Sequence, residues 1–172
     1  MKALIPTPTP FSTSVRWLAF GCCALLCACS SSEPEILHQQ PIPVSLNAVK
    51  NVNPNPDGMA APIVTRVYQL TSKDRFMVAD PMQLLQHDTQ TLGDDQVGRD
   101  EFILQPGANN HFTLPANDKV HFVGIVAAYR AIDKDEWRKL ITVPDGHQQL
   151  TLDVTVGASG VQVKDDLKAA AR

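Results

Sequence analysis

Short runs of alternating apolar and polar residues, separated by turn-forming residues, make up most of the chain after residue 43. The clearest run is QLTLDVTV at residues 149–156, in which Leu150, Leu152, Val154 and Val156 are apolar. Such alternation predicts a strand with one buried face. By the same criteria, further strands are predicted over residues 43–52, 63–70, 100–104, 111–114, 137–143 and 160–164.

One run differs because it is almost entirely apolar. Residues 120–130, VHFVGIVAAYR, fit a central strand buried on both faces better than an edge strand. With this run the chain has about eight strands at short spacing. Antiparallel sheets with one apolar face must cover it, so the sequence predicts a mainly β, two-sheet antiparallel β-sandwich of transthyretin-like type.

A single helix is predicted between the second and third strands, at residues 80–87, DPMQLLQH. Asp80 is suited to the N-cap and Pro81 to the first helical position. The charged, Ala-rich tail, residues 165–172, suggests a frayed helix. The apolar residues expected to face the sheet are Phe76, Met82, Leu84 and Leu85.

A long proline-rich loop separates the first two predicted strands. It consists of Asn53, Pro54, Asn55, Pro56, Asp57, Gly58, Met59, Ala60, Ala61 and Pro62. This composition excludes a strand or helix interior. Ten residues exceed a plain hairpin connection of two to five, although a simple connection stays possible. Loops on a rigid sandwich are common recognition sites, and Met59 between small residues would offer an adaptable apolar tip.

The four cysteines all lie between Cys22 and Cys29. A basic start with Lys2 and Arg16, a short apolar run and small residues before a cleavage site are typical of a secretory signal peptide. The sequence LCAC at residues 26–29 resembles a bacterial lipobox, in which the thiolate of Cys29 would receive the lipid.

Two other interpretations of this segment exist. A membrane-spanning helix needs roughly 20 apolar residues, whereas the run from Trp17 to Cys29 has 13. An ordinary cleaved signal with incidental cysteines is the second. We favour a lipoprotein with a signal peptide at residues 1–28, a lipidated tether at 29–42 and a β-sandwich domain at 43–172. The covalent lipid on Cys29 is then the only attached group, and no cofactor is expected.

The net charge and the number of cysteines argue against several further classes of function. Removing residues 1–28, which hold Lys2 and Arg16 but no acid, changes the net charge from −3 to −5. A mildly acidic surface gives no reason to expect a nucleic-acid partner. With Cys29 lipidated, no thiol remains for a disulfide, a zinc site or cysteine catalysis.

Recognisable catalytic or metal-binding patterns are lacking. The histidines, His38, His87, His111, His121 and His147, have no metal-ligand spacing. Residues 157–160, GASG, fit a hairpin turn better than a nucleophile turn. Asp133, Asp135 and Glu136 alternate with basic residues and indicate a solvated hairpin. An enzyme is therefore not expected.

Several stretches resemble one family. They are NAVKNV with the loop at residues 47–62, IVTRVYQL at 63–70, Phe76 with Ala79-Asp80, Leu84-Leu85, Thr91-Leu92-Gly93, VGIVAAYR at 123–130 and Trp137-Arg138. In this order they resemble the TssJ (SciN) family of type VI secretion outer-membrane lipoproteins. Arg66, Tyr68, Arg130 and Trp137 are marks of this family, and their strand positions suit packing as well as contact.

The resemblance implies a two-sheet sandwich anchored in the inner leaflet of the outer membrane. It also implies binding to the periplasmic C-terminal region of an IcmF-like (TssM) inner-membrane subunit through the loop at residues 53–62. Ser30, in place of Asp after the acylated Cys29, suggests sorting to the outer membrane. A ligand-binding or carrier lipoprotein is the alternative function, and it would need a deep apolar cavity.

Overall fold

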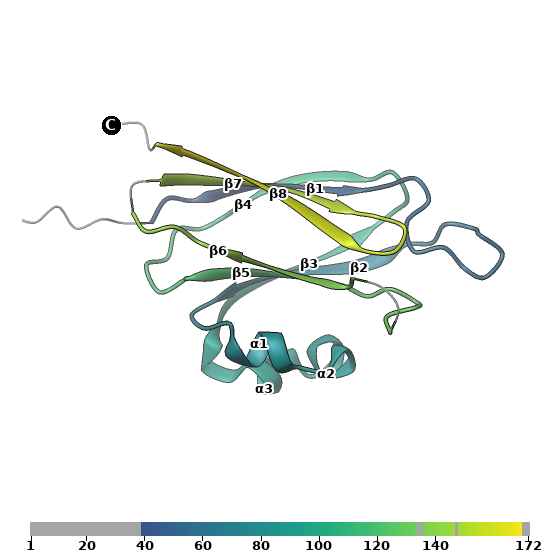
Figure 1. The fold of residues 1–172 in the computed structure, drawn as a ribbon, viewed down its shortest axis with the longest axis horizontal. Helices are drawn as coiled ribbons and strands as arrows, with labels where there is room; N and C mark the ends of the chain where they lie inside the picture. The colour runs from purple at the N-terminus through teal and green to yellow at the C-terminus, as the bar shows by residue number, and fades with distance from the viewer. Residues whose placement is uncertain (1–38, 134–135, 147, 170–172) are drawn as a thin grey trace, which may run out of the picture. The chain divides into compact units, whose positions relative to one another are not determined.

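The computed structural model describes residues 39–133, 136–146 and 148–169. These residues form two stacked four-stranded sheets with a layer of short helices on one outer face (Figure 1). The predicted fold class, a mainly β two-sheet sandwich, is confirmed. The signal peptide, Cys29 and most of the predicted tether lie outside the described residues.

The first sheet has the strand order β4-β1-β7-β8 and the second has the order β3-β2-β5-β6. The strands are β1 (Ile42–Ala48), β2 (Ile63–Leu70), β3 (Gln96–Leu104), β4 (Asn109–Leu114), β5 (Phe122–Ala127), β6 (Arg138–Thr142), β7 (Gln148–Val156) and β8 (Val161–Ala169). All neighbours pair in antiparallel fashion except β1 and β7, which are parallel. This pair departs from the antiparallel expectation, since β1 and β7 run in the same direction through the sheet.

The main core lies between the two sheets. The alternating residues of β7 point into it as predicted, and Leu152, Val154 and Val156 are fully buried. The nearly apolar β5 is central in its sheet and is buried on both faces, also as predicted. A second apolar cluster lies between this sheet and the helices and contains Tyr68, Leu70, Phe76, Ala79, Leu84, Leu92 and Val126.

The helical layer differs from the single predicted helix. It consists of α1 (Asp74–Val78), α2 (Pro81–Gln86), α3 (Asp88–Leu92) and the 3₁₀ turn η1 (Gly93–Asp95). Asp80 caps α2 and Pro81 begins it, as predicted, with the Asp80 carboxylate 2.9 Å from the Met82 amide nitrogen. The placement of Met82 against the sheet is wrong, since Met82 is 49% exposed. Leu84 is the buried residue of this helix, and Met82, two positions before it, lies about 200° away around the helix axis.

Several strand boundaries also differ from prediction: β3 begins four residues earlier than predicted, and β5 is shorter than the predicted range of 120–130. β1 ends at Ala48 because the following residues turn, and the Val52 amide donates to the Val49 carbonyl. The predicted C-terminal helix is wrong as far as Ala169, because β8 pairs with β7 along its whole length. The turn at residues 157–160 joins β7 and β8 as a hairpin connection, as predicted.

Candidate functional site

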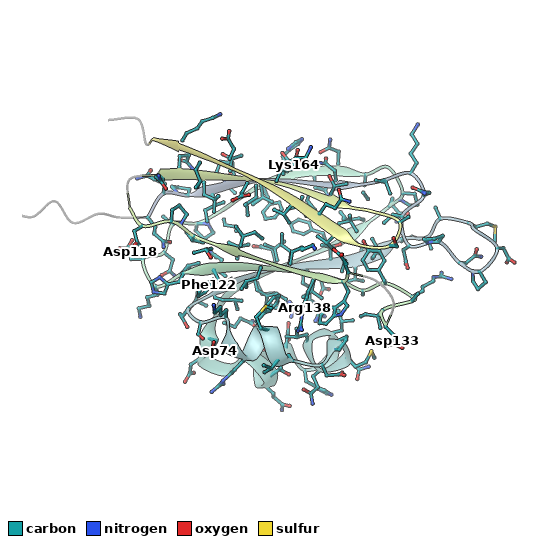
Figure 2. All side chains as sticks on the ribbon, in the orientation of Figure 1. Asp74, Asp118, Phe122, Asp133, Arg138 and Lys164 are labelled. Atoms are coloured by element: carbon teal, nitrogen blue, oxygen red, sulfur yellow. The ribbon has the colours of Figure 1, made fainter. Side chains whose placement is uncertain are left out.

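The proline-rich loop projects from one end of the sandwich, where β1 ends and β2 begins (right in Figure 1). The chain enters β1 at the opposite end. There the Gln39 amide donates to Asp118, 2.8 Å away, and the Gln149 side chain donates to the Pro41 carbonyl, at 2.6 Å. Asp118 and Asp133 mark these two ends in Figure 2. Strand β1 therefore separates the described N-terminal residues from the loop by the length of the sandwich.

Asn53 fixes the base of the loop. Its side chain is buried, donates to the Pro62 carbonyl at 3.0 Å and accepts from the Arg130 amide at 2.9 Å. It thus ties the two arms of the loop to each other and to the β5–β6 connection. Its φ of 45° lies in the left-handed region, which asparagine tolerates better than most residues.

Neighbouring connections support the same base. The Val49 amide donates to the Val156 carbonyl, and the Val49 carbonyl accepts from Gly107 in the β3–β4 turn. The Ala61 amide donates to the Val52 carbonyl across the loop. The loop is therefore continuous with the hydrogen-bonded ends of both sheets, a feature that the sequence does not reveal.

Asn55 organises the tip of the loop. Its side-chain oxygen accepts from the amides of Asp57 at 3.0 Å and Met59 at 2.8 Å, and its backbone bonds to Gly58 and Met59. Gly58 adopts a φ of 79°, which glycine accommodates without strain. This closed turn leaves the Met59 side chain 62% exposed. The sequence-predicted loop is thus a compact turn with an apolar residue at its surface.

Two of the family-marking residues hold the helical layer in place. Arg66 on β2 donates to the Leu84 and Leu85 carbonyls, both at 2.9 Å, and to Glu101 at 2.6 Å. Tyr68 lies beside it, fully buried, with its hydroxyl 3.1 Å from Asp88. Burial raises the pKa of Tyr68 to about 12. The carbonyls at the end of α2 are therefore satisfied by a strand residue.

The other two family-marking residues, Arg130 and Trp137, also make contacts within the fold. Trp137 is half-buried, and its ring lies 4.7 Å from the guanidinium of Arg138. Arg138 donates to the Phe76 and Ala79 carbonyls at the end of α1, and Figure 2 shows it between its sheet and the helices. Arg130 contributes its backbone amide to Asn53 while its side chain is exposed. The described contacts of these residues position elements of the fold.

Where the structure describes them, the histidine and acidic residues that were candidates for catalysis or metal binding do not gather at one site. His87, His111 and His121 are exposed on separate elements, and the His111 ring lies 3.0 Å from the Ser45 hydroxyl. His38, Asp135 and His147 lie outside the described residues. Among the described residues, no group of three or more His, Cys, Asp or Glu side chains is arranged to hold a metal ion. No helix in the described part of the chain is long and apolar enough to cross a membrane.

This two-sheet sandwich with an inserted helical layer is similar to solved lipoproteins of type VI secretion systems. The family described as "Type VI secretion lipoprotein, VasD, EvfM, TssJ, VC_A0113" matches residues 40–159. The chain therefore belongs to the type VI secretion lipoprotein family that includes TssJ. A comparison with curated protein sequences finds no match.

Solved structures agree with this assignment. The chain is similar to the lipoprotein TssJ1 of Pseudomonas aeruginosa, with 34% identity, a TM-score of 0.70 and coverage of 77% of this chain and 99% of the other. It is similar to Serratia marcescens Lip, described as a membrane-bound component of the type VI secretion system, with 25% identity, a TM-score of 0.67 and coverage of 72% and 96%. A chain in a structure described as the TssM C-terminal domain from EAEC shares the fold, with 22% identity, a TM-score of 0.57 and coverage of 72% and 97%.

Proposed function

We propose that this protein is anchored to the periplasmic face of the outer membrane by lipid on Cys29. We further propose that its loop, residues 53–62, binds the periplasmic C-terminal region of the IcmF-like (TssM) inner-membrane subunit. In this role the protein tethers the type VI secretion membrane complex to the outer membrane. The observation that carries the proposal is the placement of the loop at the end of the sandwich opposite Gln39.

The geometry suits a tether. Gln39 lies ten positions after Cys29 in the sequence, and an extended chain of ten steps reaches at most about 36 Å. The domain end that bears Gln39 would then face the membrane and the loop would face away from it. Two or more acyl chains are needed for durable anchoring, which a triacylated Cys29 would supply.

The loop also has the properties of a preformed binding element. Its base is bonded to the β5–β6 and β3–β4 connections and to the end of β7, and the side chain of Asn55 closes its tip. A loop held in its bound conformation loses little conformational entropy on association. Met59 supplies an exposed, unbranched apolar side chain that adapts to an irregular partner surface.

A matched pair of methionine substitutions tests the loop. Met59→Asp should weaken binding to the purified periplasmic region of the IcmF-like subunit by roughly tenfold or more, since an apolar contact is replaced by a charge. Met82→Asp places the same charge on another exposed methionine, in α2, and should leave affinity unchanged. Calorimetric titration measures both. Equal affinities for Met59→Asp and the unaltered protein would remove the loop from the mechanism.

Lipidation is tested separately. Cys29→Ser should release the protein from the membrane fraction into the soluble periplasm and abolish type VI secretion, while the Met59 site still binds its partner in solution. Labelling with a palmitate analogue should mark the unaltered protein and not the Cys29→Ser variant. Unlabelled mature protein that remains functional would contradict the anchoring proposal.

A further inference from the structure

The two long sides of the sandwich differ in how they are closed. On the β3–β4 side the chain crosses between the sheets, and the rings of Phe102 and Phe112 lie 4.6 Å apart. On the other side, edge strands β6 and β8 do not pair with each other, and an isolated bridge joins Glu136 and Gly160, the residues near the start of each strand. Beyond this bridge lies an open groove of about 660 Å³. Its lining includes Lys139, Leu140, Ile141, Val163, Asp165 and Leu167.

Within the described residues, β8 pairs with β7 alone, so one edge of its backbone is not bonded to another strand. The Gly157 amide donates to the Gly160 carbonyl, which fixes the alternation of the β7–β8 ladder. In an antiparallel ladder every second residue bonds to the neighbouring strand and the others point away. The amide of Val161 points away from β7 and donates to Glu136. The same alternation directs the N–H and C=O groups of Val163, Asp165 and Leu167 outward.

The side chains of these three residues share the inner face of β8. Val163 is half-buried against the core, whereas Leu167 is 48% exposed. Asp165 lies between them on the groove, and it forms no ion pair with any residue of the described ranges. Lys139, across the groove, is already paired with Glu136 at 2.5 Å. The groove therefore has apolar positions on either side of an unneutralised carboxylate.

We propose that β8 is an acceptor edge for an extended segment of a partner protein. The segment would carry a basic residue with apolar residues two positions before and after it. Its backbone would extend the sheet beside β8, its apolar side chains would enter the groove, and its basic side chain would lie opposite Asp165. This surface lies along the side of the sandwich and does not depend on the loop function proposed above.

A second copy of this chain is a poorer occupant. In the antiparallel self-pairing that places Val163 opposite Leu167, Asp165 lies opposite Asp165, and like charges directly opposite each other are unfavourable. Inward-pointing charge on an edge strand is a known protection against self-association. The same carboxylate thus disfavours a copy of β8 and favours a strand of opposite charge.

The experiment titrates the isotope-labelled protein with the heptapeptide TVTKTVT and, as a control, with TVTETVT. Binding is measured from the changes in the amide NMR chemical shifts of the protein. The lysine peptide should bind saturably at concentrations up to about 1 mM, with the largest shifts at Val163, Asp165 and Leu167. The glutamate peptide should bind at least about two- to fivefold more weakly, the range of an exposed ion pair.

Neighbouring carboxylates provide a matched control. Asp165→Asn should remove most of the preference for lysine, and Asp165→Lys should reverse it. Asp166→Asn should leave the preference unchanged, since Asp166 lies on the outer face, where it pairs with Lys168 at 3.2 Å. Leu167→Pro removes an outward N–H, which an edge strand tolerates, together with an apolar side chain of the groove. It should abolish binding with the β circular dichroism spectrum retained.

Four outcomes would overturn the proposal. The first is the absence of saturable binding by either peptide. The second is equal binding of the lysine and glutamate peptides, and the third is shifts confined to residues away from β8. The fourth is concentration-dependent dimerisation of the unaltered protein through β8, which analytical ultracentrifugation detects and which would assign the edge to a second copy.

Discussion

The base of the loop allows a quantitative prediction for Asn53. Replacing it with alanine removes two hydrogen bonds, to the Pro62 carbonyl and from the Arg130 amide. Each contributes about 1 kcal/mol to stability. The φ of 45° costs alanine about 1 kcal/mol more than asparagine. Asn53→Ala should therefore lower the free energy of unfolding by about 3 kcal/mol.

Asn53→Gly separates these contributions. Glycine adopts the left-handed conformation freely, so this variant should lose only about 2 kcal/mol, mainly from the two hydrogen bonds. In a domain of this size, the alanine variant should melt about 10 °C lower than the unaltered protein. Urea titration measures the free energy and calorimetry the melting temperature.

The ranking of the two variants is the decisive result. If Asn53→Ala lost less than about 1 kcal/mol, or were no less stable than Asn53→Gly, the assigned role of Asn53 would be refuted. A small loss would mean that the loop opens locally before the sandwich unfolds. The loop would then not be preformed for binding.

Three further predictions concern the sandwich and its helical layer. Thr65 is fully buried, and its hydroxyl oxygen lacks a hydrogen-bond partner among the described residues. Thr65→Val should therefore raise the free energy of unfolding by about 1 kcal/mol in urea titration. A lower free energy of unfolding would indicate that the hydroxyl has an unrecognised partner. Gly124→Ala would place its Cβ 2.7 Å from the ring of buried Phe76, which should cost about 1–3 kcal/mol, and an unchanged melting temperature would show that the helical layer moves freely. The folded-state pKa of Tyr68 is raised to about 12. The stability linked to its proton is therefore complete below about pH 10, the ordinary tyrosine pKa, and falls as the pH rises from about 10 to 12. Tyr68→Phe should make this alkaline loss of stability smaller, and a pH profile identical to that of the unaltered protein would contradict the prediction.

The parts of the fold with strong local patterns were predicted well. The β2 boundaries match the predicted range because its β-branched and aromatic residues lie between a proline-rich loop and a polar turn. Strand β7 follows from strict alternation and β5 from an unbroken apolar run. In each case the local sequence and the tertiary environment favour the same structure.

The errors arise where tertiary contacts outweigh local preference. The end of β8 contains Lys168 and Ala169, good helix formers, yet pairing with β7 makes it a strand. Helices α1 and α3 have five residues each, too few to show a helical period. The loop is visible in the sequence, but the contact between Asn53 and Arg130 joins residues 77 positions apart and leaves no local signal.

The course of β1 has a mechanical consequence. This strand runs from the end that bears Pro41 to the end that bears the loop, and it is bonded to β4 on one side and β7 on the other. A pulling force applied between these two ends would act along the strand axis, so both ladders would bear the load in shear at once instead of opening bond by bond. A domain pulled in this direction should withstand higher forces in optical-trap measurements than the same domain pulled across the β7–β8 hairpin.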